Sequence, residues 1–95
     1  MKKAGAKNLF QDLGFDGQES ANLLIRSNLM MEITKFIEGK KMTQAKAARF
    51  FGVAQPRISD LMRGKIQMFT VDTLISMLAH AGVNVGIVLS KKKAA

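Results

Sequence analysis

The sequence predicts a mainly α-helical protein: a compact bundle of four to five helices followed by one C-terminal β-strand. Apolar residues recur at helical spacing in several segments between residues 18 and 81, and glycines separate these segments. The stretch VNVGIVL at 83–89 then alternates and is rich in β-branched residues, as strands are. With 95 residues, of which 47% are hydrophobic, the chain is long enough for one domain with a core.

The domain is expected to span residues 9–89, between a disordered basic tail at 1–8 and a frayed basic end at 90–95. Within it, LFQDLGFDG is predicted to form one helical turn. No apolar run approaches the roughly 20 residues of a membrane span, and no signal peptide follows the basic start. The chain has no cysteine, which excludes disulfides and thiolate metal sites and fits a reducing compartment. These features predict a soluble cytoplasmic protein.

The longest predicted helix covers residues 18–38. Gly39, before Lys40 and Lys41, is expected to end it in the left-handed conformation. Further apolar residues predict a helix buried on two sides or, alternatively, one with a partner surface. The predicted stripe is Ile25, Leu29, Ile33, Phe36 and Ile37, and the additional residues are Leu23, Leu24, Met30 and Met31.

Three shorter helices are predicted over 43–51, 56–63 and 70–81, with a loop at 64–69. Thr43 and Thr70 are suited to cap two of them, because a hydroxyl can accept from a free backbone N–H. Glycines 52, 64 and 82 end the three helices. The predicted core stripe of the last helix is Val71, Leu74, Ile75 and Leu78.

The predicted strand has no partner within a helical chain. The simplest partner is the same strand of a second subunit, related by a two-fold axis. The sequence therefore predicts a homodimer, and its interface residues are Val83, Val85, Ile87 and Leu89.

The stretch TQAKAARFFGVAQPRIS at 43–59 has the spacing of two short helices that cross at Gly52. A small residue, Ala48, stands where the helices approach, and Gly52 can adopt positive φ at little cost. Val53 and Ile58 are placed to fill the angle between the helices. This pattern is typical of a helix-turn-helix.

Positive charge is concentrated around this motif. The chain has a net charge of +8, and residues 40–65 contain seven basic residues against one acid, Asp60. A solvated surface would explain a charge run, but a local excess of +6 favours a polyanion partner, most simply nucleic acid.

The segment MTQAKAARFFGVAQPRISDLMRGK resembles the Cro/repressor-type, or XRE, family, which implies a phage-repressor-like fold. With NLFQDLGF, FTVDTL and HAGVNVGIV, residues 8–89 are similar to the small HigA-type antitoxin subgroup. The resemblance implies a dimeric repressor of its own operon at the nucleoid. It also implies binding to a palindromic operator in double-stranded DNA and to a RelE-like mRNA-cleaving toxin. Two alternatives are a stand-alone phage-like regulator and a protein-interaction module on a helix-turn-helix scaffold.

In such motifs the first turn of the second helix enters the major groove. Glutamine there can contact adenine and arginine can contact guanine, while proline initiates the helix and holds its neighbour in place. The resemblance thus implies that the base-reading residues are Gln55, Pro56, Arg57 and Ser59. The candidate phosphate contacts are Lys40, Lys41, Thr43, Gln44, Lys46, Arg63 and Lys65. Arg49 is an alternative case, expected to pair with Asp60.

No catalytic or metal-binding constellation is recognisable. His80 is the only histidine, and no acid, serine or cysteine stands at a catalytic spacing from it. It is interpreted as a packing residue or a partner of the helix dipole. The seven methionines are interpreted as core. The sequence therefore predicts a binding protein that has no cofactor and is not an enzyme.

Overall fold

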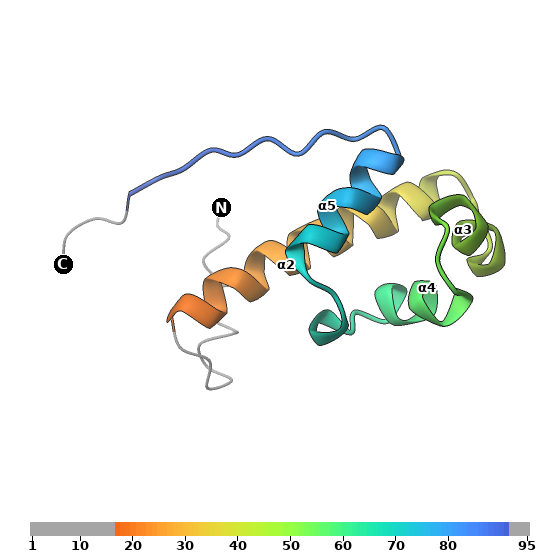
Figure 1. Ribbon diagram of the computed structural model, residues 1–95, viewed down its shortest axis with the longest axis horizontal. Helices are drawn as coiled ribbons and strands as arrows, with labels where there is room; N and C mark the ends of the chain where they lie inside the picture. The colour runs from red at the N-terminus through yellow and green to blue at the C-terminus, as the bar shows by residue number, and fades with distance from the viewer. Residues whose placement is uncertain (1–16, 92–95) are drawn as a thin grey trace.

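Four α-helices and one short 3₁₀ helix follow one another in the computed structural model, which describes residues 17–91 (Figure 1). The helical bounds agree with the sequence-based prediction to within one or two residues. The predicted basic tail at 1–8, the helical turn within 9–16 and the end of the tail beyond 91 lie outside the described residues. The elements are α2 (Gly17–Gly39), α3 (Gln44–Phe51), α4 (Gln55–Met62), η1 (Ile66–Met68) and α5 (Val71–His80).

The helices form one core between them. The long helix α2 packs against α5, and α3 packs against α4 at one end of α2 (Figure 1). Ile37, Ala47, Ile58 and Leu74 come from four different helices, and each is 0% exposed. The core thereby fixes α3 and α4 as a unit on α2. No helix in the described part of the chain is long and apolar enough to cross a membrane.

The buried face of α2 differs from the predicted stripe. Leu23, Met30, Ile33 and Ile37 are buried, whereas Ile25 is 51% exposed. Ile25 lies two residues from Leu23, which places it about 200° around the helix, on the opposite face. Met31 is 54% exposed, so burial on two sides was also a wrong prediction. Leu29 and Phe36 are partly buried beside the core.

The end of α2 corrects a second expectation. Gly39 is the last helical residue, and the left-handed conformation is adopted two residues later by Lys41 (φ 54°). The helix continues one residue beyond the predicted stop and is closed by a backbone hydrogen bond from Met42 to the carbonyl of Ile37 (3.1 Å). The closing turn therefore falls on a lysine rather than on the glycine.

The crossing of α3 and α4 follows the prediction. Thr43 caps α3, because its hydroxyl accepts from the backbone N–H of Lys46 (3.1 Å). Gly52 has φ 69° and donates to the carbonyl of Arg49, which ends the helix. Ala48 is 6% exposed and Ile58 0% exposed, and Val53 packs beside them. The small and apolar residues of the motif therefore sit where the two helices meet.

Replacing Gly52 with alanine is expected to destabilise the fold by about 1–2 kcal/mol, since a residue with a Cβ is strained at left-handed φ. No atom within 4 Å would meet the added Cβ, so backbone strain is the cause that this variant isolates. Urea unfolding checks it, with Gly39→Ala as the matched control: Gly39 has the same free space and no positive φ. Equal effects of the two substitutions would contradict the strain.

The segment between α4 and α5 is more ordered than the predicted loop. It contains η1, and Phe69 directly after it is 2% exposed within the core. Thr70 then caps α5, as predicted, with its hydroxyl accepting from the N–H of Thr73 (3.2 Å). Leu74 and Leu78 of the predicted stripe are buried, and so is Met77.

The predicted strand at 83–89 is not formed in the single chain. The segment after α5 runs as extended chain away from the helices, and no strand is present among residues 17–91 (Figure 1). Val85 still packs against the core, but Ile87 and Leu89 are 78% and 89% exposed. Alternation alone does not make a strand, because a strand needs a neighbour for its hydrogen bonds.

Candidate nucleic-acid interface

The first turn of α4 is open to solvent. Ala54 precedes it in extended conformation and has no side-chain cap. The helix begins at Gln55, so Pro56 is its second residue rather than its first as predicted, and Gln55 is helical. The proline still sacrifices no hydrogen bond, because the first four N–H groups of a helix have no intrahelical acceptor. Gln55 and Pro56 are both exposed.

Three of the four predicted base-reading residues meet a predicted phosphate contact. Gln55, Pro56 and Ser59 from α4 line one shallow depression together with Gln44 from the start of α3. Gln44 and Ser59 are half-buried, which limits their freedom, while Gln55 and Pro56 stand out. Two amides, a hydroxyl and an apolar ring offer donors, acceptors and an apolar contact, which are the groups that read base edges.

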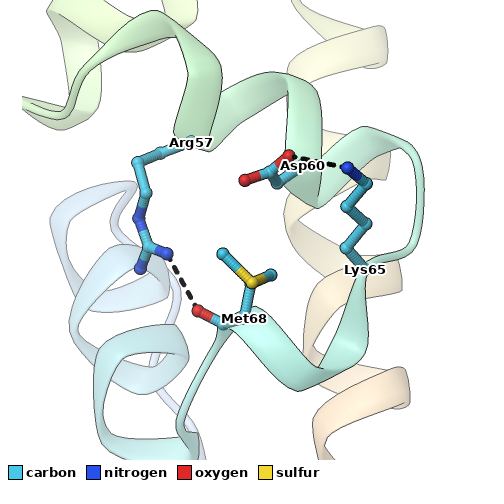
Figure 2. Close-up of polar contacts among 4 residues, drawn as sticks. All are labelled: Arg57, Asp60, Lys65 and Met68. Atoms are coloured by element: carbon cyan, nitrogen blue, oxygen red, sulfur yellow. Dashed lines mark hydrogen bonds and ion pairs between the residues drawn. The ribbon is translucent and has the colours of Figure 1, made fainter.

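Arg57, the fourth predicted base reader, points elsewhere. Its Nη1 donates to the carbonyl oxygen of Met68 (2.8 Å) (Figure 2). Its guanidinium carbon lies 4.3 Å from the centroid of the Phe69 ring. Arg57 is therefore engaged with the segment that follows α4. Its contact with a guanine stays a prediction.

The predicted phosphate contacts flank α4. Lys40, Lys41, Thr43 and Lys46 are exposed around the start of α3, and Arg63 and Lys65 are exposed just after α4. This spread of cations at both ends of the motif suits a polyanion that crosses it. Thr43 already accepts a hydrogen bond as the α3 cap.

Two of these cations have partners in the protein. Nζ of Lys65 lies 3.5 Å from Oδ1 of Asp60 (Figure 2). The predicted ion pair between Arg49 and Asp60 is therefore wrong, because Asp60 pairs with Lys65. Lys65 is five residues away along the same turn of chain, whereas Arg49 lies on α3. Nζ of Lys40 is 5.8 Å from the centroid of the Phe36 ring.

Sequence reasoning missed Arg26. From the middle of α2, its Nη1 donates to the carbonyl oxygens of Ile66 (3.3 Å) and Phe69 (3.2 Å). Its Nε donates to Oδ1 of Asn22 (2.7 Å), one turn earlier on the helix. The only available signal was the i, i+4 spacing of Asn22 and Arg26. The carbonyl partners of Arg26 lie 40 and 43 residues away, so no pattern in the sequence around Arg26 indicates them.

His80 is the last residue of α5 and contacts the end of α3. Its Nε2 is 2.7 Å from the carbonyl oxygen of Phe50, and its ring packs edge-to-face on Phe50 with 5.0 Å between centroids. A carbonyl only accepts, so Nε2 carries the hydrogen. The contact ties α5 to the end of α3.

The family model described as a helix-turn-helix domain matches residues 9–90. This chain belongs to the helix-turn-helix domain family. The matched span includes α3 and α4, together with α2 and α5, which hold them.

Among solved structures, this helix-turn-helix protein is similar to one described as a putative XRE family transcriptional regulator. The TM-score is 0.74 at 29% sequence identity, over 81% of this chain and 90% of that chain. No curated protein matches it. In the helix-turn-helix protein the depression lined by Gln44, Gln55, Pro56 and Ser59 therefore lies at the start of the second helix of the motif, the helix that such proteins place in the major groove.

Proposed function

We propose that this protein is a sequence-specific, DNA-binding transcriptional regulator that acts as a repressor. The observation that carries the proposal is the convergence of Gln44, Gln55, Pro56 and Ser59 on the exposed start of the second helix of a helix-turn-helix. Residues 40–65, which surround this site, have a net charge of +6. The likeness to a putative XRE family transcriptional regulator supports the same role. The protein would act in the cytoplasm at the nucleoid, as a binding protein and not as an enzyme.

Within this proposal, α4 lies in the major groove and presents its first turn to the base edges. The Gln55 amide offers one donor group and one acceptor, which match N6 and N7 of adenine. Ser59, one turn later, reaches an adjacent base, and Gln44 contacts the phosphate beside it at the start of α3. The cations at the two ends of the motif neutralise phosphates on either side of the groove.

Gln55→Ala is expected to relax base preference at one position of each half-site and to weaken binding there by about 1–3 kcal/mol. Duplexes are first selected by the wild-type protein from a randomised pool, and binding is then measured to every single-base variant of the selected sequence. Gln18→Ala, at an exposed glutamine in the first turn of α2, is the matched control. If the wild-type protein selects no sequence from the pool, the proposed function is wrong.

We further propose that the repressor is a homodimer that pairs residues 83–89 across a two-fold axis. The support is the exposure of an apolar, alternating segment: Ile87, Val88 and Leu89 are 78%, 95% and 89% exposed. A paired strand would bury alternate side chains and satisfy the backbone of both copies. It would also place two copies of α4 on a palindromic operator.

The double substitution of Ile87 and Leu89 by serine is expected to weaken this dimer by about 1.5–3 kcal/mol for each apolar side chain that is no longer buried. Sedimentation equilibrium measures the change, and circular dichroism checks that the helices are kept. Val88→Ser is the matched control, because residue 88 faces the opposite side of an extended strand. Equal effects at 87/89 and at 88, or none at all, would argue against strand pairing.

The finer proposal is an antitoxin that also neutralises a RelE-like mRNA-cleaving toxin. It rests on the resemblance of FTVDTL and HAGVNVGIV to HigA-type antitoxins. A neighbouring gene for a small basic RelE-like protein, whose product forms a complex with this chain, would support it. Absence of such a gene would favour the stand-alone regulator. The protein-interaction module would be favoured only by a lack of DNA binding.

A further inference from the structure

Arg57 is fixed to the segment that follows α4. The Phe69 ring under its guanidinium is 2% exposed and held in the core, so the ring offers a rigid face. A guanidinium hydrogen bond to a carbonyl is among the stronger ones in proteins, and a cation over an aromatic face adds to it. The ring contact is made with a buried side chain, whereas the hydrogen bond to the Met68 carbonyl is solvent-exposed.

Asp60 makes a second contact between α4 and the same segment. It lies three residues after Arg57, on the same face of the helix, and pairs with Lys65 just before η1. Arg57 holds Met68 at the other end of η1 (Figure 2). One face of α4 is thus attached at both ends of the short helix.

The segment is in turn attached to α2. Arg26 donates to the carbonyls at 66 and 69, and Asn22 orients the Arg26 side chain. Two arginines from two helices therefore bind three carbonyl oxygens of the same short segment, those of residues 66, 68 and 69. The path from Arg57 through residues 66–69 to Arg26 joins the second helix of the motif to the longest helix of the fold.

We infer that Arg57 is a positioning residue: it sets the orientation of α4 for DNA recognition through the Met68 carbonyl and the Phe69 ring, and it does not itself read a base. The inference rests on the proposed DNA-binding function. Bases are then read by Gln55 and Ser59, whose side chains line the separate depression with Gln44. Loss of Arg57 lets α4 shift and disturbs all of these contacts together.

The test compares Arg57→Ala, Arg57→Lys and wild type on the selected duplex, on each single-base variant of it and on a scrambled duplex. Arg49→Ala is the control, since it removes the same charge from an exposed side chain on α3. We expect Arg57→Ala to lower affinity for the selected duplex by about tenfold or more and to relax preference at several base pairs together. Binding to the scrambled duplex should change only as it does for Arg49→Ala. Arg57→Lys, which keeps a donor for Met68, should recover part of the preference.

Two results would overturn the inference. A loss confined to one base pair per half-site would make Arg57 a base reader. Unchanged preference with lowered thermal stability would make it merely structural. Amide hydrogen exchange, measured without DNA, gives an independent readout: Arg57→Ala should speed exchange in residues 65–69 and in α4, whereas Arg49→Ala should not. If the wild-type protein binds no DNA sequence selectively, the proposed function fails, and Arg57 then positions nothing for recognition.

Discussion

Phe69→Ala is expected to destabilise the fold by about 3–5 kcal/mol. The ring is 2% exposed, packs in the core cluster with Ile37, Ile58 and Leu74, and lies under the guanidinium of Arg57. Its removal opens a cavity among residues from three helices and takes away the face on which Arg57 rests. Urea unfolding followed by circular dichroism measures the loss, which is a large part of the stability of a domain this small.

Two further variants separate the parts of this effect. Phe69→Leu keeps an apolar side chain in the core but removes the aromatic face, so it should destabilise less while still freeing Arg57. Met68→Ala changes a neighbour that is 51% exposed and leaves the Met68 carbonyl in place, so its effect should stay within about 0.5 kcal/mol. If Phe69→Ala were no more harmful than Met68→Ala, the buried ring would not be central to the core.

Raising the salt concentration from about 50 to 200 mM is expected to weaken DNA binding by about 10³–10⁵-fold if six to ten phosphates are contacted. The proposed contacts supply that number in a dimer, because each subunit has five basic candidates. Logarithmic affinity should fall with logarithmic salt by about 0.9 for each phosphate neutralised. Fluorescence anisotropy of a labelled duplex across a salt series gives the slope. The five candidates are Lys40, Lys41, Lys46, Arg63 and Lys65.

Alanine substitution of any one of these five residues should reduce that slope. The structure also predicts which substitution has the smallest effect. Lys65→Ala should reduce the slope least, because Lys65 already pairs with Asp60 at 3.5 Å. Lys35→Ala is the control: Lys35 is exposed on α2 and pairs with Glu32 (3.6 Å), outside the basic segment. Binding that did not respond to salt would remove nucleic acid as the partner.

The parts of the fold that the sequence predicted are those set by neighbouring residues. Thr43, Ala48, Gly52 and Ile58 lie within 16 positions, and each acts on the next helix or turn. Their sizes and φ preferences are enough to predict two crossing helices. The depression at the start of α4 was predictable for the same reason, because Gln55, Pro56 and Ser59 lie on one turn and Gln44 on the helix before it.

The contacts of Arg57 could not be predicted in the same way. An arginine in the first turn of such a helix satisfies the pattern of a base reader whether it points outward or back to the fold. The choice depends on a carbonyl 11 residues away and on a buried ring after η1. A local signal for that ring did exist: Phe69 and Leu74 stand before and within the first turn of α5, the spacing of a hydrophobic staple.

The C-terminal segment, residues 83–89, shows a second feature that the sequence alone could not predict, the pairing of a strand. Val83, Val85 and Ile87 alternate as strand residues do, but pairing is a property of two segments and not of one. In the single chain the first of these residues stay near the helices, with Val85 against the core, and the later ones are exposed. Sequence pattern therefore predicted the extended shape and could not supply the hydrogen-bonded neighbour.

On α4, the residues that pack against the fold differ from those that line the depression, and this separation has a consequence for protein engineering. The residues that hold the helix in place are Arg57, Ile58 and Leu61. Before and between them along the chain lie the residues of the depression, Gln55, which is exposed, and Ser59, which is half-buried. The residues that hold α4 and the residues that line the depression belong to the same short helix. The proposed recognition of bases does not depend on side-chain contacts between these two groups. Positions 55 and 59 can thus be diversified in a library while the residues that hold α4 are kept, so that new operator preferences are sought on an unchanged scaffold.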